Sequence, residues 1–166
     1  MAKDTPSMAK NKIRRCLGAV LDPHPTSSEV KTLWMYFQST CAYCGIYIDP
    51  ESRTGHLDHI IPSALGGTNE IHNYLLACSR CNGDEKRDED WQSFLERKIA
   101  DRALVDTRRS HILAWIGKAN GRVIRDPAVI AEADAIIFQA LEEFDKAVKK
   151  LRALRGGNSK LSIPDL

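Results

Sequence analysis

The sequence has no apolar run of roughly 18 residues, the length that crosses a membrane, so it predicts no membrane-spanning helix. Too few apolar residues follow its basic N-terminus for a secretory signal, and we therefore expect an intracellular, cytoplasmic protein. Internal repeats and low-complexity tracts are also lacking. With 166 residues, 43% of them hydrophobic, the chain suits one domain with an appendage.

Net charge is nearly absent, since 24 lysines and arginines face 22 aspartates and glutamates, giving +2 at pH 7. This balance does not by itself indicate a nucleic-acid partner. The basic residues are unevenly placed, however: eight lie in residues 97–125 beside two acidic ones, and five lie in residues 1–20 beside one. Such segments can contact phosphates, although charged runs are more often solvated surface.

The five cysteines are few but regularly spaced. Four of them form two Cys-x-x-Cys pairs, and two such turns together supply the tetrahedral sulfur ligands that zinc prefers. An intracellular chain disfavours disulfide bonds, and a thioredoxin-like redox site would need only one pair. The spacing therefore predicts a structural zinc bound by Cys41, Cys44, Cys78 and Cys81, while Cys16 is given no role.

The hydrophobic pattern divides the chain into four parts. Residues 1–25 are predicted to be a loose basic arm and linker, because a Pro-x-Pro segment closes them. Residues 26–100 contain both cysteine pairs, residues 101–155 are helical, and residues 156–166 form a flexible tail. The fold class that follows is α+β and mostly helical.

Within residues 26–100, short apolar runs and turn residues predict strands, and three-four apolar spacing predicts helices. A glycine after each second cysteine, Gly45 and Gly83, is expected at positive φ. The expected elements are a helix over about 28–39 that begins near Thr26, strands over 46–48, 56–61 and 74–77, a loop over 62–69, and a helix over 82–100.

The last third of the chain is predicted to hold two helices, over residues 101–117 and 128–155. The second opens at Asp126-Pro127, a favourable helix start. Its apolar or small residues recur at three-four spacing from residue 130 to residue 151. A helix this long packs within its own chain or pairs with a second copy, so a homodimer through this helix stays an alternative.

Between the cysteine pairs lie groups suited to phosphodiester chemistry. Asp58 offers an anionic oxygen and Asn82 a neutral one, a combination that can hold magnesium or manganese. His59 is the side chain best matched to accept a proton near neutral pH. A hard cation beside an imidazole is an arrangement that hydrolyses phosphodiesters. An isolated Asp-His pair would more often be a polar turn, but here that interpretation must also explain the cysteine pairs.

The combined pattern resembles the HNH endonuclease family, whose site is the ββα-metal fold and is often stapled by zinc. The resemblance covers about residues 41–90 and implies that residues 26–100 form a zinc-stapled HNH nuclease domain flanked by an N-terminal helix and C-terminal helices. The matching residues are Asp58, His59, Ile60, Pro62, Gly66, Gly67, Asn73, Cys78, Cys81 and Asn82.

The resemblance also implies roles for individual residues. His59 would be the general base, and Asp58 the carboxylate that ligates a catalytic magnesium or manganese ion. Asn73 would fix the loop and the orientation of the base. Asn82 stands where many members have histidine, as in the His-Asn-Asn subset, and would be the second metal ligand.

Phosphate contacts are less sharply implied. Lys86 would lie near a phosphate, but it follows Asn82 by four residues where three is commoner, so Arg80 and Arg87 are further candidates. His56 lies two residues before Asp58, on the same face of a strand. It is open as a third ligand, a phosphate contact or an ordinary strand residue.

The sequence thus favours a metal-dependent DNA endonuclease that leaves 5′-phosphate and 3′-hydroxyl ends. The alternative is a non-catalytic zinc-ribbon module that binds nucleic acid or protein. DNA is preferred over RNA from the resemblance alone, because no residue pattern indicates contact with a 2′-hydroxyl. The sequence is equally compatible with a role in a phage, in restriction or in defence, and a protein partner is possible in each of these systems.

Overall fold

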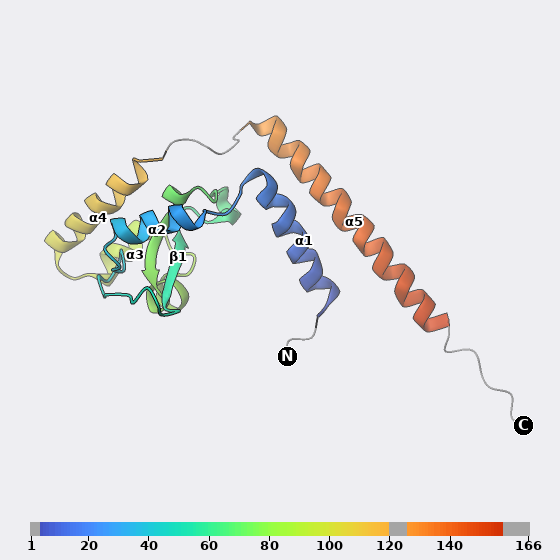
Figure 1. The fold of residues 1–166 in the computed structure, drawn as a ribbon, viewed down its shortest axis with the longest axis horizontal. Coiled ribbons are helices and arrows are strands. Elements are labelled where there is room, and N and C mark those ends of the chain that lie inside the picture. Colours follow the sequence, from blue (N-terminus) through green and yellow to red (C-terminus); the bar gives the residue numbers. More distant parts are fainter. Residues whose placement is uncertain (1–3, 120–125, 158–166) are drawn as a thin grey trace, which may run out of the picture. The chain divides into compact units, whose positions relative to one another are not determined.

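The computed structural model describes residues 4–119 and 126–157 (Figure 1). The chain divides into two units, of which one is built from the first and last helices and the other lies within residues 22–123. The fold is α+β and mostly helical, as the sequence predicts. No helix in the described ranges is long and apolar enough to cross a membrane.

A two-stranded antiparallel sheet forms the centre of the larger unit. Strand β1 (Gly55–His59) pairs with β2 (Tyr74–Cys78) so that Asp58 lies opposite Leu75 and His59 opposite Tyr74. The strand predicted over 74–77 is confirmed, whereas the one predicted over 56–61 ends at His59. The strand predicted over 46–48 is wrong, because that segment makes only an isolated bridge between Thr40 and Tyr47.

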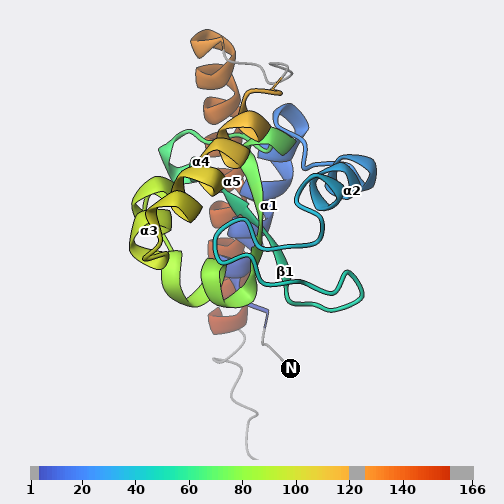
Figure 2. The same cartoon turned by 90° about the vertical axis from the view of Figure 1, so that its left-hand side faces the viewer.

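Three helices cover the sheet (Figures 1 and 2). Helix α2 (Ser27–Tyr36) begins at a capping box, in which Thr26 accepts from the Glu29 N–H and Glu29 accepts from the Thr26 N–H. It ends three residues earlier than predicted. Helices α3 (Trp91–Lys98) and α4 (Arg102–Ile116) begin at the capping carboxylates of Asp90 and Asp101.

The helix predicted over 82–100 is in two pieces. Residues 80–86 form η3, a π-helical turn, and α3 follows after a break at Arg87, whose φ is 50°. The positive φ expected at Gly45 is confirmed, with a value of 72°. The positive φ expected at Gly83 is wrong, because this residue lies inside η3. The predicted loop over 62–69 contains one short 3-10 turn, η1 (Ser63–Leu65), and a second, η2 (Ile71–Asn73), follows it and leads into β2.

The core of this unit is aromatic and aliphatic. Residues 74–77 of β2 are fully enclosed, with α2, α4 and η2 packed around them. Trp115 of α4 is buried and donates its indole N–H to the Tyr74 carbonyl at 2.9 Å. Tyr43 and Phe94 meet edge to face, with ring centroids 5.0 Å apart. The core therefore joins α3 and α4 to the segments that carry the cysteines.

The smaller unit corrects the prediction of a loose N-terminal arm. Residues Pro6–Leu21 form helix α1, which packs antiparallel to α5 (Pro127–Gly157). Ile13 and Leu17 are half-buried there, and Lys10 pairs with Asp145 at 2.5 Å. The apolar residues of this segment recur at helical spacing among the basic ones, and the prediction gives weight only to the charges. Helices α4 and α5 confirm both predicted C-terminal helices. Of the flexible tail predicted over 156–166, residues 158–166 lie outside the described ranges.

Candidate metal centre and active site

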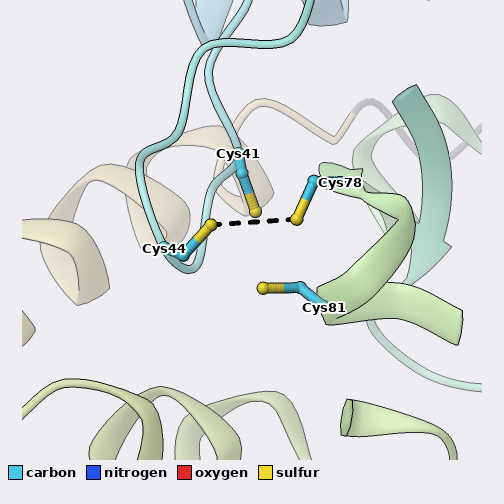
Figure 3. A group of neighbouring side chains, drawn as sticks. All are labelled: Cys41, Cys44, Cys78 and Cys81. Carbon is cyan, nitrogen blue, oxygen red and sulfur yellow. Dashed lines mark hydrogen bonds between the residues drawn. The ribbon is translucent and has the colours of Figure 1, made fainter. Parts of the chain in front are cut away.

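The four paired cysteines converge on one point (Figure 3). Cys41 and Cys44 come from the turn after α2, Cys78 ends β2, and Cys81 lies in η3. Their sulfur atoms all lie within 4.8 Å of one another, and the sulfurs of Cys44 and Cys78 are 3.8 Å apart. Zinc bound tetrahedrally to four thiolates at about 2.3 Å requires sulfurs at this spacing, so the cluster fits a structural zinc.

The protonation of the thiols also fits a cation. A hydrogen bond from the Cys81 thiol lowers the pKa of Cys41 to about 5, whereas burial raises the pKa of Cys44 to about 11. Without a cation, the cluster thus favours deprotonation of one thiol and disfavours deprotonation of the others. A bound metal ion removes that resistance, since it requires its sulfur ligands to be deprotonated.

The first cysteine turn is anchored from α4. Arg108 donates a hydrogen bond to the Tyr43 carbonyl, and its guanidinium group lies where a side chain on residue 45 would project. The positive φ of residue 45 favours glycine there, and a larger residue would also have to displace the Arg108 guanidinium group.

Asp58 is buried at the end of β1, with only 5% of its surface exposed. The Tyr43 hydroxyl donates to its Oδ2 at 2.6 Å, and the Lys86 ammonium lies 3.2 and 3.3 Å from its two oxygens. Burial raises the pKa of Asp58, and the contacts with Tyr43 and Lys86 act in the opposite direction. The carboxylate is thus held by one residue of a cysteine turn and one of η3.

Lys86 lies in the interior, 3% exposed, paired with Asp58. A π-helical turn holds one more residue per turn than an α-helical one, and so accommodates the extra residue between Asn82 and Lys86. Of the other phosphate-contact candidates, Arg80 is 76% exposed in its side chain and pairs with Glu85 at 2.7 Å. Arg87 is exposed, and makes no ion pair within the described part of the chain.

His59 follows Asp58 at the end of β1 and lies opposite Tyr74 of β2. Its ring packs on Tyr74 with centroids 4.1 Å apart, and its Nε2 is buried without a hydrogen bond to any described residue. Burial lowers the pKa of His59, while the Asn69 side chain acts in the opposite direction. The direction of this pKa shift favours the neutral imidazole.

A polar network behind His59 was missed by the sequence analysis. Asn69 accepts from the Tyr74 hydroxyl at 2.6 Å, and its backbone N–H donates to the Asp22 carboxylate at 2.8 and 2.9 Å. Asn69 and Asp22 are 47 residues apart, so no local spacing could have indicated their contact.

Asn73 closes the loop that follows His59. Its side-chain amide donates to the carbonyls of Ile61 and Thr68, at 3.0 and 2.8 Å, and its carbonyl oxygen accepts from the Ile61 N–H at 2.9 Å. Gly67 packs so closely on the Ile61 carbonyl that a larger residue would clash. These contacts hold residues 61 and 68, near the two ends of the loop, to the same side chain.

Asn82, directly after Cys81, is half-buried in η3, and its side chain has no hydrogen bond to another described residue. His56 is exposed near the start of β1. Within the described residues, the four cysteines are the one group of three or more acidic, histidine or cysteine side chains arranged to hold a metal ion.

Residues 41–95 match the HNH endonuclease family. The matched HNH domain contains both cysteine turns, both strands, η3 and the first part of α3. It therefore includes Asp58, His59, Asn73 and Asn82. A search of curated proteins found no match to the chain.

The cysteine cluster predicts about one zinc ion per purified chain. Cys78→Ser leaves three sulfur ligands and should yield zinc-depleted, poorly soluble protein, because β2 and η3 are then no longer tied to the first turn. Cys16→Ser, which changes an exposed cysteine outside the cluster, should retain the full zinc content. Elemental analysis measures both, and folded wild-type protein without zinc would refute the assignment.

The buried pair predicts a specific pattern of stability. Lys86→Met leaves the Asp58 carboxylate without its cation and should lower the free energy of unfolding by about 3–5 kcal/mol. Asp58→Asn combined with Lys86→Met leaves no buried charge and should recover most of that loss. Urea unfolding of the zinc-loaded proteins tests this; a double variant no more stable than Lys86→Met would contradict it.

Proposed function

We propose that the protein is a metal-dependent endonuclease that hydrolyses phosphodiester bonds in DNA. The observation that carries this proposal is the HNH family match over residues 41–95, a segment that retains Asp58, His59 and Asn82. A module kept only for its zinc fold would have no need of these three side chains together.

The donor chemistry fits a hard divalent cation. Asp58 and Asn82 offer a carboxylate and an amide oxygen, the ligands that magnesium and manganese take. A carboxylate has about four lone-pair positions. Tyr43 and Lys86 leave part of this capacity for an ion. Bound there, the ion would offset negative charge on the leaving oxygen.

His59 would act as the general base. Its neutral ring accepts a proton from a water molecule, which then attacks phosphorus as the bond to the 3′ oxygen breaks. The 3′ oxygen leaves as a hydroxyl after protonation, and the phosphate stays on the 5′ end of the other fragment. Asn73 keeps the loop after His59 closed, and the packing of Tyr74 on the ring limits its orientation.

Arg87 and Arg80 are the side chains we assign to phosphate contact. Arg87 is exposed directly after η3, the turn that carries Asn82, and has a positive φ of 50°. Strained backbone of this kind is retained where the surrounding structure enforces it, often at functional sites. Lys86 is instead assigned to Asp58, since the two form a buried ion pair.

A non-catalytic zinc module is the second candidate, and one observation favours it. Asp58 is almost fully buried and already bonded to Tyr43 and Lys86. If this pair were purely structural, the domain would bind nucleic acid without cutting it. Incubating supercoiled plasmid with the zinc-loaded protein and magnesium separates the two candidates.

His59→Ala should reduce plasmid cleavage by about 10²–10⁴-fold, the usual cost of removing a general base. DNA affinity should change little, because the phosphate contacts lie elsewhere. His56→Ala is the matched control, since it removes an exposed histidine from the same strand. Cleavage by His59→Ala at more than half the wild-type rate would exclude His59 as the base.

The catalytic ion should be weakly held and lost on purification, because the chain supplies only two oxygen ligands for it. Brief EDTA treatment that spares the zinc should abolish cleavage, and magnesium or manganese should restore it. Asn82→Ala should raise the ion concentration needed or eliminate cleavage, whereas Asn82→His should retain part of it. End-labelling should reveal 5′-phosphates and 3′-hydroxyls; 3′-phosphates, or full activity in EDTA, would contradict the ligand assignment.

A further inference from the structure

Helix α5 has its charges in two separate blocks. Residues 126–145 contain six acidic residues and no basic one, whereas residues 146–157 contain five basic residues and no acidic one. Acidic residues near a helix N-terminus and basic ones near its C-terminus suit the helix dipole, but that effect is confined to the terminal turns. The dipole therefore does not account for blocks that meet in the interior of the helix.

Helix α1 covers only part of the apolar surface of α5. Leu141 is the one side chain of α5 that the described part of the chain buries, and Lys10 pairs with Asp145 beside it. Ile136, Leu151 and Leu154 are 57%, 66% and 68% exposed. The helix thus leaves large apolar side chains in solvent on both sides of the charge boundary.

These exposed side chains share one flank of α5. Ile136 and Leu154 are eighteen residues apart, or about five full turns, so they project in the same direction, and Leu151, three residues before Leu154, lies about 60° further around the helix. Glu132 and Lys150 are also eighteen residues apart, and both are exposed. They line one edge of the apolar flank, the acidic residue in one half of α5 and the basic residue in the other.

We propose that this flank of α5 binds the same flank of a second copy of the chain, with the two helices antiparallel. In a two-fold antiparallel pair in which Glu132 of each copy meets Lys150 of the other, residues 126–136 of each helix face residues 146–156 of its partner, so three acidic residues of each copy lie opposite the basic block of the other. Ile136, Leu151 and Leu154 are then removed from water on both copies.

The charge pattern selects a second copy over other occupants. A partner of a single charge sign, such as DNA, would match the basic half of α5 and be repelled by the acidic half. A second copy matches the acidic segment 126–136 and the basic segment 146–156 at once, because the antiparallel arrangement places each of them opposite the other. The inference uses only α1 and α5 and does not depend on the proposed nuclease activity.

The test is sedimentation of full-length protein at about 100 µM, where even a dimer with a dissociation constant on the order of 10 µM is populated. The wild-type protein should be dimeric. Glu132→Lys and Lys150→Glu should each raise the dissociation constant about tenfold, since two symmetric contacts become repulsive. The matched control is Lys149→Glu, which makes the same charge change about 200° around the helix from Leu151 and should leave the dimer intact.

Complementary charges should restore association. The double variant Glu132→Lys/Lys150→Glu, and an equimolar mixture of the two single variants, should both return to wild-type dimerisation, because every repulsive contact becomes attractive again. A monomeric wild-type protein would overturn the proposal. So would weakening of DNA binding by Lys149→Glu and Lys150→Glu alike without any change in mass, which would assign the basic block to phosphate contact.

Discussion

The convergence of four cysteine thiols on one point is the constraint on which the site depends. The cluster holds together two cysteine turns that are separated by 33 residues. Each turn places a residue of the proposed site: Tyr43 lies within the first turn, and Asn82 follows Cys81 in the second. The sheet that links them has only two strands, so it cannot fix these turns by itself. Zinc binding in such modules contributes on the order of 10–16 kcal/mol, comparable with the stability of a whole domain.

Through Tyr43 the zinc turn reaches the carboxylate at the centre of the proposed chemistry. Asp58 is held from one side by Tyr43 and from the other by Lys86 of η3, the turn that also contains Cys81. Both supports of Asp58 therefore come from segments that the thiol cluster places. A buried ion pair of this kind is weak support for stability, but it fixes the orientation of its members. A metal ion held by the four cysteines would thus also orient a ligand of the ion proposed to act in the reaction.

The sequence predicted those features that depend on local spacing. The cysteine pairs, the adjacent Asp58 and His59, and the strand that ends at Cys78 are all visible within a few residues of one another. The missed contacts join distant segments: Tyr43 to Asp58, and Asn69 to Asp22 across 47 residues. The sequence predicts a loose basic arm over residues 1–25, whereas residues 6–21 form a helix whose apolar residues pack against α5, a contact that the local sequence does not reveal. The burial of Lys86 depends on the π-helical form of η3, which no propensity scale predicts.

The central claim is that Asp58 and Asn82 bind a divalent ion next to His59 in a zinc-stabilised domain. Diffraction at the zinc and manganese absorption edges, from crystals of zinc-loaded protein soaked in manganese, measures this directly. The account predicts a zinc peak among the four cysteine sulfurs and a separate manganese peak in contact with oxygens of Asp58 and Asn82. A zinc peak alone, with Asp58 still enclosed by Tyr43 and Lys86 at saturating manganese, would contradict it.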